Sequence, residues 1–98
     1  MKISFSSNRL AAAGTSIVEA NRLFGALIGR KYVQRVAIFR AAGKFTELFG
    51  HKALRLHPLK GKRAGQYAVT LTGNWRLVFE KMDEDEVRIL SVEDYHGD

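Results

Sequence analysis

The spacing between apolar residues changes once along this 98-residue chain, near residue 52. Before that point apolar residues recur every three to four positions, which predicts amphipathic helices. After it they alternate with polar residues, which predicts half-buried strands. A short alternating segment at residues 2–5 adds a strand at the start. The order predicts one α+β domain over residues 1–98, with an N-terminal strand and two helices packed on an antiparallel sheet of about four to five strands.

Two helices are expected between residues 16 and 43. Ser16 and Glu19 have the spacing of a capping box, which marks the first helical start. The apolar positions that follow at helical spacing are Ile17, Ala20, Phe24 and Leu27, then Ile28, Tyr32, Val36 and Phe39. The other face of the second helix is read as solvated and carries Arg30, Lys31, Arg35 and Arg40.

Glycines mark the ends of these helices. Either Gly25 or Gly29 is expected at the joint between them, and the sequence leaves the choice open. Gly43 is expected to end the second helix as a left-handed cap. One further helical turn is expected over 46–50.

Four strands are expected after residue 52. The first covers 54–57 and is ended by Pro58, after which a basic loop runs over 60–65. The next two form a hairpin around a turn at 73–74, and the last follows an acidic turn at 82–86. Their inward residues are expected to be Tyr67, Val69, Leu71, Trp75, Leu77, Phe79, Val87, Ile89 and Val92.

The charge is distributed unevenly along the chain. Residues 1–76 hold 14 basic and two acidic residues, whereas residues 77–98 hold two basic and eight acidic ones. A basic body of this kind favours a polyanionic partner, such as nucleic acid or the ribosome.

Several classes of protein are disfavoured. The chain has no cysteine, which excludes disulfides, thiolate zinc sites and a cysteine nucleophile. Its three histidines lack the spacing of metal ligands, so no metal or other cofactor is expected. No apolar stretch approaches the ~20 residues that cross a bilayer, and no signal peptide is visible. We therefore expect a cytoplasmic protein without membrane contact.

Side chains suited to chemistry gather in the second half of the chain. In a meander of strands, the segments around residues 57, 76 and 95 can converge on one face. The cleft would then be surrounded by His57, Lys60, Arg63, Arg76, Tyr95 and His96. Histidines can act as base and acid near neutral pH, and arginines can bind a phosphate as its charge increases. Tyrosine can hydrogen-bond a nucleophile or stack on a base.

Each of these features also has a structural interpretation. A single histidine at a strand end is more often a surface residue, and terminal residues such as Tyr95 and His96 are often solvated. The basic loop at 60–65 is compatible with an ordinary solvated turn. The combination of these groups favours metal-independent RNA cleavage, in which a base activates a ribose 2′-hydroxyl.

Four segments, in this order, resemble the HigB-like toxins of the RelE/ParE superfamily, the killer proteins of bacterial plasmid-maintenance systems. They are LRLHPLKG at 54–61, RAGQY at 63–67, GNWRLVFE at 73–80 and VEDYH at 92–96. The resemblance covers a little under half of the chain, and residues 8–50 match only in helical character.

The resemblance implies a RelE-like fold and a type II toxin that is a ribosome-dependent mRNA endoribonuclease. Its expected partners are the ribosome with bound mRNA and a helix-turn-helix, HigA-like antitoxin, with operator DNA bound only through the antitoxin complex. The implied catalytic residues are His57, Arg76, Asp94, Tyr95 and His96. Those implied to bind RNA or phosphate are Lys60, Arg63 and Asn74, joined by Lys62, where these toxins often carry an acid. Which histidine is the acid and which is the base stays open.

Two other functions are compatible with the same chain. A ParE-like toxin shares the expected fold but inhibits DNA gyrase without cutting RNA, and the presence of His57, Tyr95 and His96 disfavours it. A plain RNA- or ribosome-binding module would use the basic loop alone, with binding that weakens steeply as salt increases.

Overall fold

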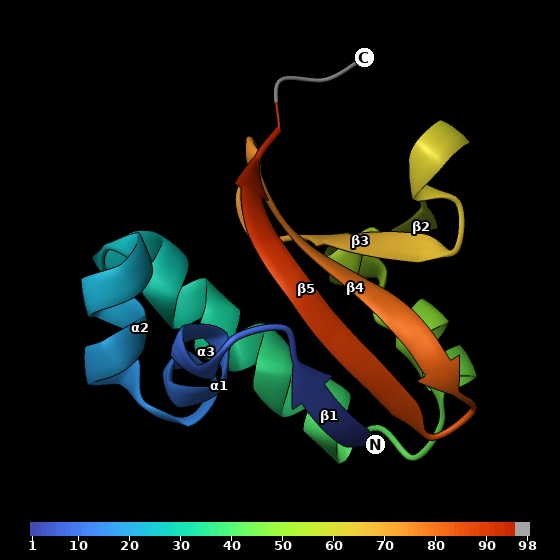
Figure 1. Cartoon of the computed structure of the whole chain (residues 1–98), viewed down its shortest axis with the longest axis horizontal. Helices are drawn as coiled ribbons and strands as arrows, with labels where there is room; N and C mark the ends of the chain where they lie inside the picture. The colour runs from blue at the N-terminus through green and yellow to red at the C-terminus, as the bar shows by residue number, and fades with distance from the viewer. Residues whose placement is uncertain (96–98) are drawn as a thin grey trace.

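The computed structural model describes residues 1–95. Three helices precede the last four strands of a five-stranded sheet, and strand β1 lies at one edge of that sheet (Figure 1). The elements are β1 (Lys2–Phe5), α1 (Asn8–Thr15), α2 (Ile17–Phe24), α3 (Ala26–Ala41), the 3-10 helices η1 (Phe45–Gly50) and η2 (Lys52–Leu54), β2 (His57–Pro58), the 3-10 helix η3 (Gly61–Arg63), β3 (Gln66–Thr70), β4 (Trp75–Asp83) and β5 (Glu86–Asp94). The α+β class is therefore confirmed.

The helical half contains three α-helices where two were expected. The additional helix, α1, begins after Ser7, whose hydroxyl accepts a hydrogen bond from the Leu10 amide at 3.1 Å. Its alanine-rich sequence has too few large apolar residues to show a helical period. The predicted cap of α2 is confirmed, because the Ser16 hydroxyl accepts from the Glu19 amide at 3.2 Å. Gly25, with a φ of 84°, forms the joint between α2 and α3.

The predicted left-handed cap at Gly43 is wrong. Helix α3 ends at Ala41, and Ala42 follows in an extended conformation. The Gly43 amide instead donates to a carboxylate oxygen of Glu47 at 2.8 Å. This contact fixes the chain between α3 and the 3-10 helix η1, which confirms the helical turn expected over 46–50.

The sheet is mixed rather than wholly antiparallel. Its strand order is β1-β5-β4-β3-β2, and β2 to β5 form the predicted antiparallel meander. Strand β1 pairs with β5 in parallel, with Lys2 opposite Glu86 and Phe5 opposite Ile89. A parallel pair needs a long crossover connection, and here the helices and the other strands provide it.

The strand predicted over 54–57 is also wrong. Leu54 ends the 3-10 helix η2, and Arg55 follows with a left-handed φ of 50°. The strand contains His57 and Pro58, which pair with Ala68 and Tyr67. Pro58 is tolerated because β2 lies at the edge of the sheet, where one side of the strand has no ladder partner.

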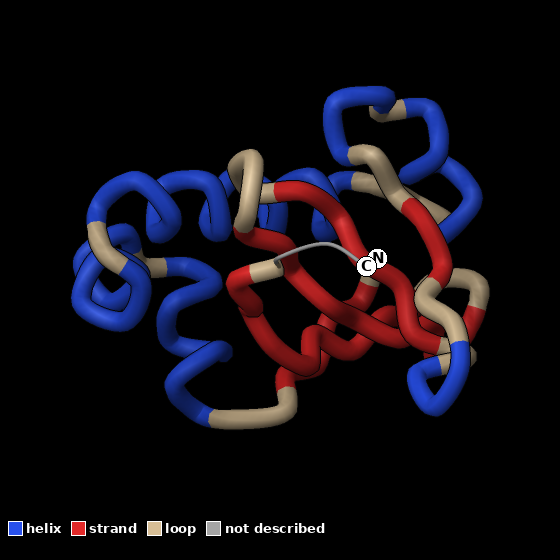
Figure 2. The backbone as a smooth tube through the Cα atoms, turned by 90° about the horizontal axis from the view of Figure 1, so that it is seen from above, coloured by secondary structure: helices blue, strands red, loops and turns tan. Residues whose placement is uncertain are grey.

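The helices cover one face of the sheet, as Figure 2 shows from above. The core between the two layers contains a group of aromatic rings. The ring centres of Phe39 and Phe79 lie 4.8 Å apart, and those of Phe45 and Tyr67 lie 4.9 Å apart. Trp75 is half-buried at the margin of this core. None of the helices within residues 1–95 has the length and hydropathy needed to cross a membrane.

The expectation that Arg35 is solvated is wrong. Its exposed fraction is 8%, and its Nε donates to the Thr70 carbonyl at 3.1 Å. Arg35 lies seven residues after Ile28 and four before Phe39, so helical geometry places it on the buried face of α3. The long apolar stem of arginine allows it to occupy this position.

Candidate active site on the open face of the sheet

The candidate site lies on the face of the sheet opposite the helices. Residues directly opposite each other in neighbouring antiparallel strands share a face, and the register aligns Thr70 with Arg76 and Arg76 with Glu93. The adjacent row aligns His57 with Ala68. Since the alternating residues of β3 and β4 that include Val69, Leu77 and Phe79 belong to the core, Arg76 and its row lie on the open face.

A bulge in β5 brings Glu93 to this face. Val78 pairs with Ser91, but the next pair joins Phe79 to Ile89, so Leu90 is left without a partner in the ladder. An extra residue of this kind reverses the alternation of side chains beyond it. Val92 therefore faces the core as Ile89 does, while Ser91 and Glu93 face the open side.

Arg76 is the most buried of the charged residues in the site. Its side chain is 15% exposed, and its Nη2 donates to Glu93 Oε1 at 3.3 Å. Its guanidinium carbon lies 4.2 Å from the centre of the Tyr95 ring, a cation–π geometry. Within residues 1–95, its buried Nε has no hydrogen-bond partner. Arg76 therefore combines a fixed plane with donor capacity that the protein leaves unused.

Glu93 connects two arginines. Its carboxylate accepts from Arg63 Nη1 at 2.9 Å and Arg63 Nη2 at 2.5 Å, from Ser91 Oγ at 2.8 Å, and from Arg76. The hydrogen bond from Arg63, partly opposed by burial, lowers the pKa of Glu93 from 4.5 to about 2. The same hydrogen bond raises the pKa of Arg63. Glu93 is therefore ionised at neutral pH and is unsuited to proton transfer there.

The ring of His57 is oriented by the backbone of the preceding turn. Its Nδ1 lies 2.8 Å from the carbonyl oxygen of Arg55. Because a carbonyl can only accept, the hydrogen bond requires a proton on Nδ1, which leaves Nε2 as the basic nitrogen of a neutral ring. The left-handed Arg55 backbone holds this carbonyl in place. A neutral ring held in this way could accept a proton at Nε2.

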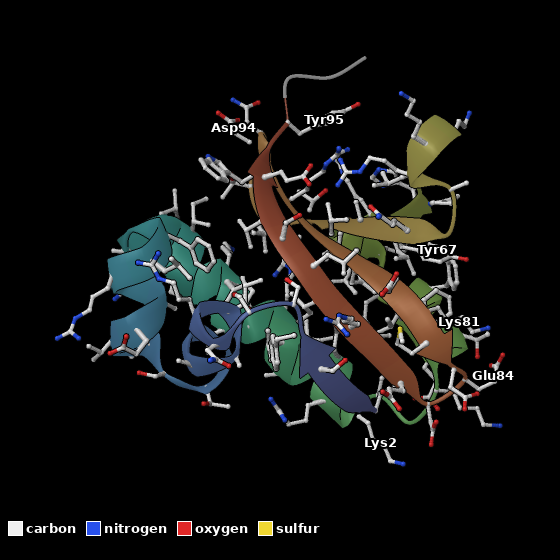
Figure 3. The ribbon with its side chains drawn as sticks, viewed as in Figure 1. Lys2, Tyr67, Lys81, Glu84, Asp94 and Tyr95 are labelled. Atoms are coloured by element: carbon white, nitrogen blue, oxygen red, sulfur yellow. The ribbon has the colours of Figure 1, made fainter. Side chains whose placement is uncertain are left out.

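Tyr95 follows directly after the last strand. Its amide donates to the carbonyl of Asn74 in the β3–β4 turn, which attaches the chain end to that turn. Figure 3 shows the side chains of Asp94 and Tyr95 leaving opposite sides of the end of β5. Figure 3 also places the Lys81–Glu84 ion pair, 2.7 Å long, at the opposite end of the β4–β5 hairpin. The acidic turn is thus far from Tyr95.

Two shallow cavities meet at the site, and His57, Arg76 and Tyr95 line both of them. The first, of about 260 Å³, is also lined by Arg55, Thr70, Thr72, Gly73, Asn74 and Trp75. The second, of about 340 Å³, is also lined by Pro58, Leu59, Lys60 and Arg63. The first cavity thus offers hydroxyl, amide and indole groups beside Arg55, and the second offers two basic side chains beside Pro58 and Leu59. The imidazole, guanidinium and phenol of the three shared residues lie between them.

The structure brings together most of the residues predicted for the site. His57, Arg76 and Tyr95 share both cavities, Asn74 lines the first, and Lys60 and Arg63 line the second. Lys62 is exposed and lines neither cavity. Asp94 is likewise exposed, at the end of β5 and outside both linings. The predicted His96 lies outside the described residues.

Two residues that matter to the geometry were not predicted. Glu93 was part of the VEDYH segment, but its function of joining two arginines depends on the bulge at Leu90. Arg55 contributes its backbone carbonyl rather than its side chain. The one available sign of the bulge was the spacing of Val87, Ile89 and Val92, which departs from a period of two.

Known proteins are similar to this chain both in sequence and in structure. No family model matches the chain. Over 42 residues it is 48% identical to endoribonuclease HigB from Proteus vulgaris, a match covering 43% of this chain and 45% of that relative. The alignment therefore compares less than half of either protein.

Three solved structures share the fold over nearly the whole chain. The YoeB-YefM complex from Staphylococcus aureus matches with a TM-score of 0.61 and 20% identity, over 99% of this chain and 98% of that one. The YoeB/ParE toxin from Agrobacterium tumefaciens matches with a TM-score of 0.58 and 16% identity, over 98% and 100%. YafQ from E. coli strain BL21(DE3) matches with a TM-score of 0.56 and 15% identity, over 95% and 91%. Over 42 residues this chain is therefore similar to endoribonuclease HigB, and it has the fold of the YoeB and YafQ structures.

Proposed function

We propose that this chain is the toxin of a type II toxin-antitoxin system, an endoribonuclease that cuts mRNA on the ribosome without a metal. The observation that carries the proposal is the meeting of His57, Arg76 and Tyr95 between two cavities. The 48% identity to endoribonuclease HigB over 42 residues supports RNA as the substrate.

The proposed reaction is attack by a ribose 2′-hydroxyl on the adjacent phosphorus. His57 Nε2 takes the hydroxyl proton, the 2′-oxygen–phosphorus bond forms, and the bond to the 5′-oxygen breaks. That oxygen leaves with a proton from the terminal Asp94-Tyr95-His96 segment. The products are a 2′,3′-cyclic phosphate and a 5′-hydroxyl. His57 is favoured as the base because its hydrogen bond to the Arg55 carbonyl leaves Nε2 unprotonated in the neutral ring.

Arg76 stabilises the phosphate as negative charge increases on its nonbridging oxygens. The position of Arg76 in both cavities, together with its fixed stacking on Tyr95, supports this role. Lys60 and Lys62 attract the RNA backbone, and Asn74 contacts the RNA from the first cavity. Arg63 adds positive charge to the same field while its fork is bound to Glu93.

The proposed partners are the ribosome with bound mRNA and a helix-turn-helix antitoxin, through which operator DNA is bound. That YoeB was solved in complex with YefM supports a protein partner for this fold. A protein that acts on translating ribosomes works in the cytoplasm, which is the compartment we propose.

The proposal is tested by incubating the purified chain with translating ribosomes and mapping new 5′ ends on the message. We expect cuts within the translated region, and a loss of about 10²–10³-fold in rate for Arg76→Ala. His57→Ala should lose at least about 10²-fold, as expected for removal of a general base.

Three outcomes would reject the proposal. If both variants cut RNA at the wild-type rate, the assignment of His57 and Arg76 to the active site would be wrong. Block of gyrase supercoiling without RNA cuts would favour a ParE-like inhibitor. RNA binding that weakens with salt, without a cut product, would indicate a plain binding module.

A further inference from the structure

We propose that Glu93 is a positioning residue that orients Arg76, and that Arg63 acts through Glu93 rather than by contacting the phosphate. The proposal rests on the function proposed above. It replaces the phosphate contact that the family resemblance implied for Arg63 with an indirect role through Glu93.

The contacts of Arg63 leave it little capacity for a phosphate. Its Nη1 and Nη2 both donate to the Glu93 carboxylate, and its Nε donates to the Gln66 side chain at 3.1 Å. A guanidinium binds a phosphate best through two parallel donors, and here the fork is already used for a carboxylate. A phosphate would have to displace an ionised carboxylate held at 2.9 Å and 2.5 Å.

Arg76 has the opposite pattern. It makes one hydrogen bond to Glu93, at 3.3 Å, and its Nε makes none within residues 1–95. The same carboxylate thus binds Arg63 strongly and Arg76 weakly. The weak contact with Glu93 and the stacking on Tyr95 together fix the plane of Arg76 beside both cavities. Glu93 itself is fixed by Ser91 and Arg63.

Charge provides a second argument. Glu93 neutralises one of the two arginine charges, so removing its carboxylate adds one net positive charge beside the cavities. Binding of a polyanion should then be maintained or strengthened. Orientation of Arg76 should be lost at the same time, which slows the chemical step. Opposite changes in binding and cleavage are the signature that a general loss of structure does not produce.

The experiment uses Arg63→Ala, Glu93→Ala and the double variant, with Glu80→Ala as a control on neighbouring strand β4. Single-turnover cleavage of ribosome-bound mRNA gives the maximal rate and the half-saturating concentration. Anisotropy of a fluorescent single-stranded RNA oligonucleotide gives the affinity and its salt dependence.

Arg63→Ala should cut about tenfold more slowly at saturation. Without Arg63 the Glu93 carboxylate binds Arg76 alone, and Arg76 is drawn away from the phosphate. Its affinity for the oligonucleotide should change by less than about threefold. Glu93→Ala should cut about 30-fold more slowly, with equal or tighter binding and a steeper salt dependence. The double variant should fall within about threefold of Glu93→Ala, because residues that act through one another are not additive. Glu80→Ala should resemble wild type.

A rate for the double variant equal to the product of the two single effects would overturn the inference. So would a large loss of oligonucleotide affinity in Arg63→Ala with its saturated rate unchanged. Thermal melting by circular dichroism identifies a variant that fails to fold, and Glu93→Gln, close in size to glutamate, then replaces Glu93→Ala.

A readout that does not require cleavage is rotation of the Arg76 guanidinium, followed by NMR of its Nη protons. Glu93→Gln should speed this rotation, and an unchanged rate would contradict the positioning role. If the wild-type protein cuts no RNA, the proposed function fails. The rotation and affinity measurements still decide the inference about Glu93 and Arg63.

Discussion

The two faces of the sheet place arginine in opposite settings. On the covered face, Arg35 reaches from α3 to the Thr70 carbonyl and to the Gln34 side chain, at 3.1 Å and 3.0 Å. On the open face, Arg76 lies opposite the same Thr70 in the β3–β4 register and contacts Glu93 and Tyr95. Both side chains are little exposed, yet burial lowers the pKa of Arg35 while a carboxylate stands beside Arg76.

The difference separates a face that stabilises the fold from a face that carries the proposed active site. The covered face is filled by aromatic and aliphatic side chains, and Arg35 joins the helices to the sheet through neutral partners. The open face carries the charged cluster and the cavities. Substitutions on the covered face should therefore change the free energy of unfolding and leave the chemistry of the folded protein intact. Those on the open face should do the reverse.

The largest effect on this comparison is expected from Phe79→Ala. Phe79 is fully buried and packs on Phe39, so the cavity left behind should lower the free energy of unfolding by about 3–5 kcal/mol. Urea denaturation measures this loss. Phe49→Ala is the control, because Phe49 is 53% exposed and its removal should cost far less. Equal losses in the two variants would contradict the assigned core.

Glu93→Gln tests a carboxylate on the open face that should also contribute to stability. Its folded pKa, about 2, lies below the 4.5 of the free group, so its contribution is present above about pH 4.5 and lost as pH falls toward 2. The wild type should exceed the variant at neutral pH by at most about 3 kcal/mol. Denaturation from pH 7 to pH 2 should show this gap closing. A constant gap would refute the contribution of the ion pairs.

Tyr32→Phe tests a buried polar contact within the helical layer. The Tyr32 hydroxyl donates to the Leu10 carbonyl at 2.7 Å, and burial raises the pKa of Tyr32. Loss of this bond should cost about 1–2 kcal/mol by thermal melting, because the carbonyl is left without its donor. RNA cleavage at a temperature where the variant is folded should be unchanged. Slower cleavage there would mean that the two faces are not independent.

Arg55→Gly should have the smallest effect. Glycine adopts a φ of 50° without strain, and the backbone carbonyl that orients His57 is kept, so the free energy of unfolding should change by less than about 1 kcal/mol. Cleavage should stay within about threefold of wild type. Arg55→Val is the matched comparison, since a β-branched residue resists this conformation. If Arg55→Gly lost cleavage while Arg55→Val kept it, the backbone role would be wrong.

The predictability of the fold followed the strength of the local patterns. The β3–β4 hairpin was predicted because Tyr67, Val69, Leu77 and Phe79 alternate cleanly around a glycine turn. The 54–57 strand was mispredicted because Leu54 and Leu56 alternate for another reason, which is that a 3-10 turn buries Leu54 in the core. Helix α1 was missed because alanines give little periodic signal.

The candidate site was predictable to a similar extent. His57, Lys60, Arg63, Arg76 and Tyr95 were predicted to converge, together with His96, which lies outside the described residues. The family resemblance added Asn74, and these six described residues line two adjoining cavities. The function of Glu93 was not predictable, because the face on which its side chain lies depends on the bulge at Leu90 in β5. The charge pattern of α3 does not reveal that Arg35 is buried. The sign of its burial is its spacing from Ile28, which places both residues on one face of the helix.

The sequence by itself determined the α+β class, the order of the last three strands and the residue types available for RNA chemistry, because period and turn residues act locally. Tertiary structure alone decided the parallel pairing of β1 with β5 and the face on which Glu93 lies. Both depend on contacts between segments distant in the chain. A one-residue bulge reverses every side chain beyond it, and only the partner strand fixes where that bulge occurs.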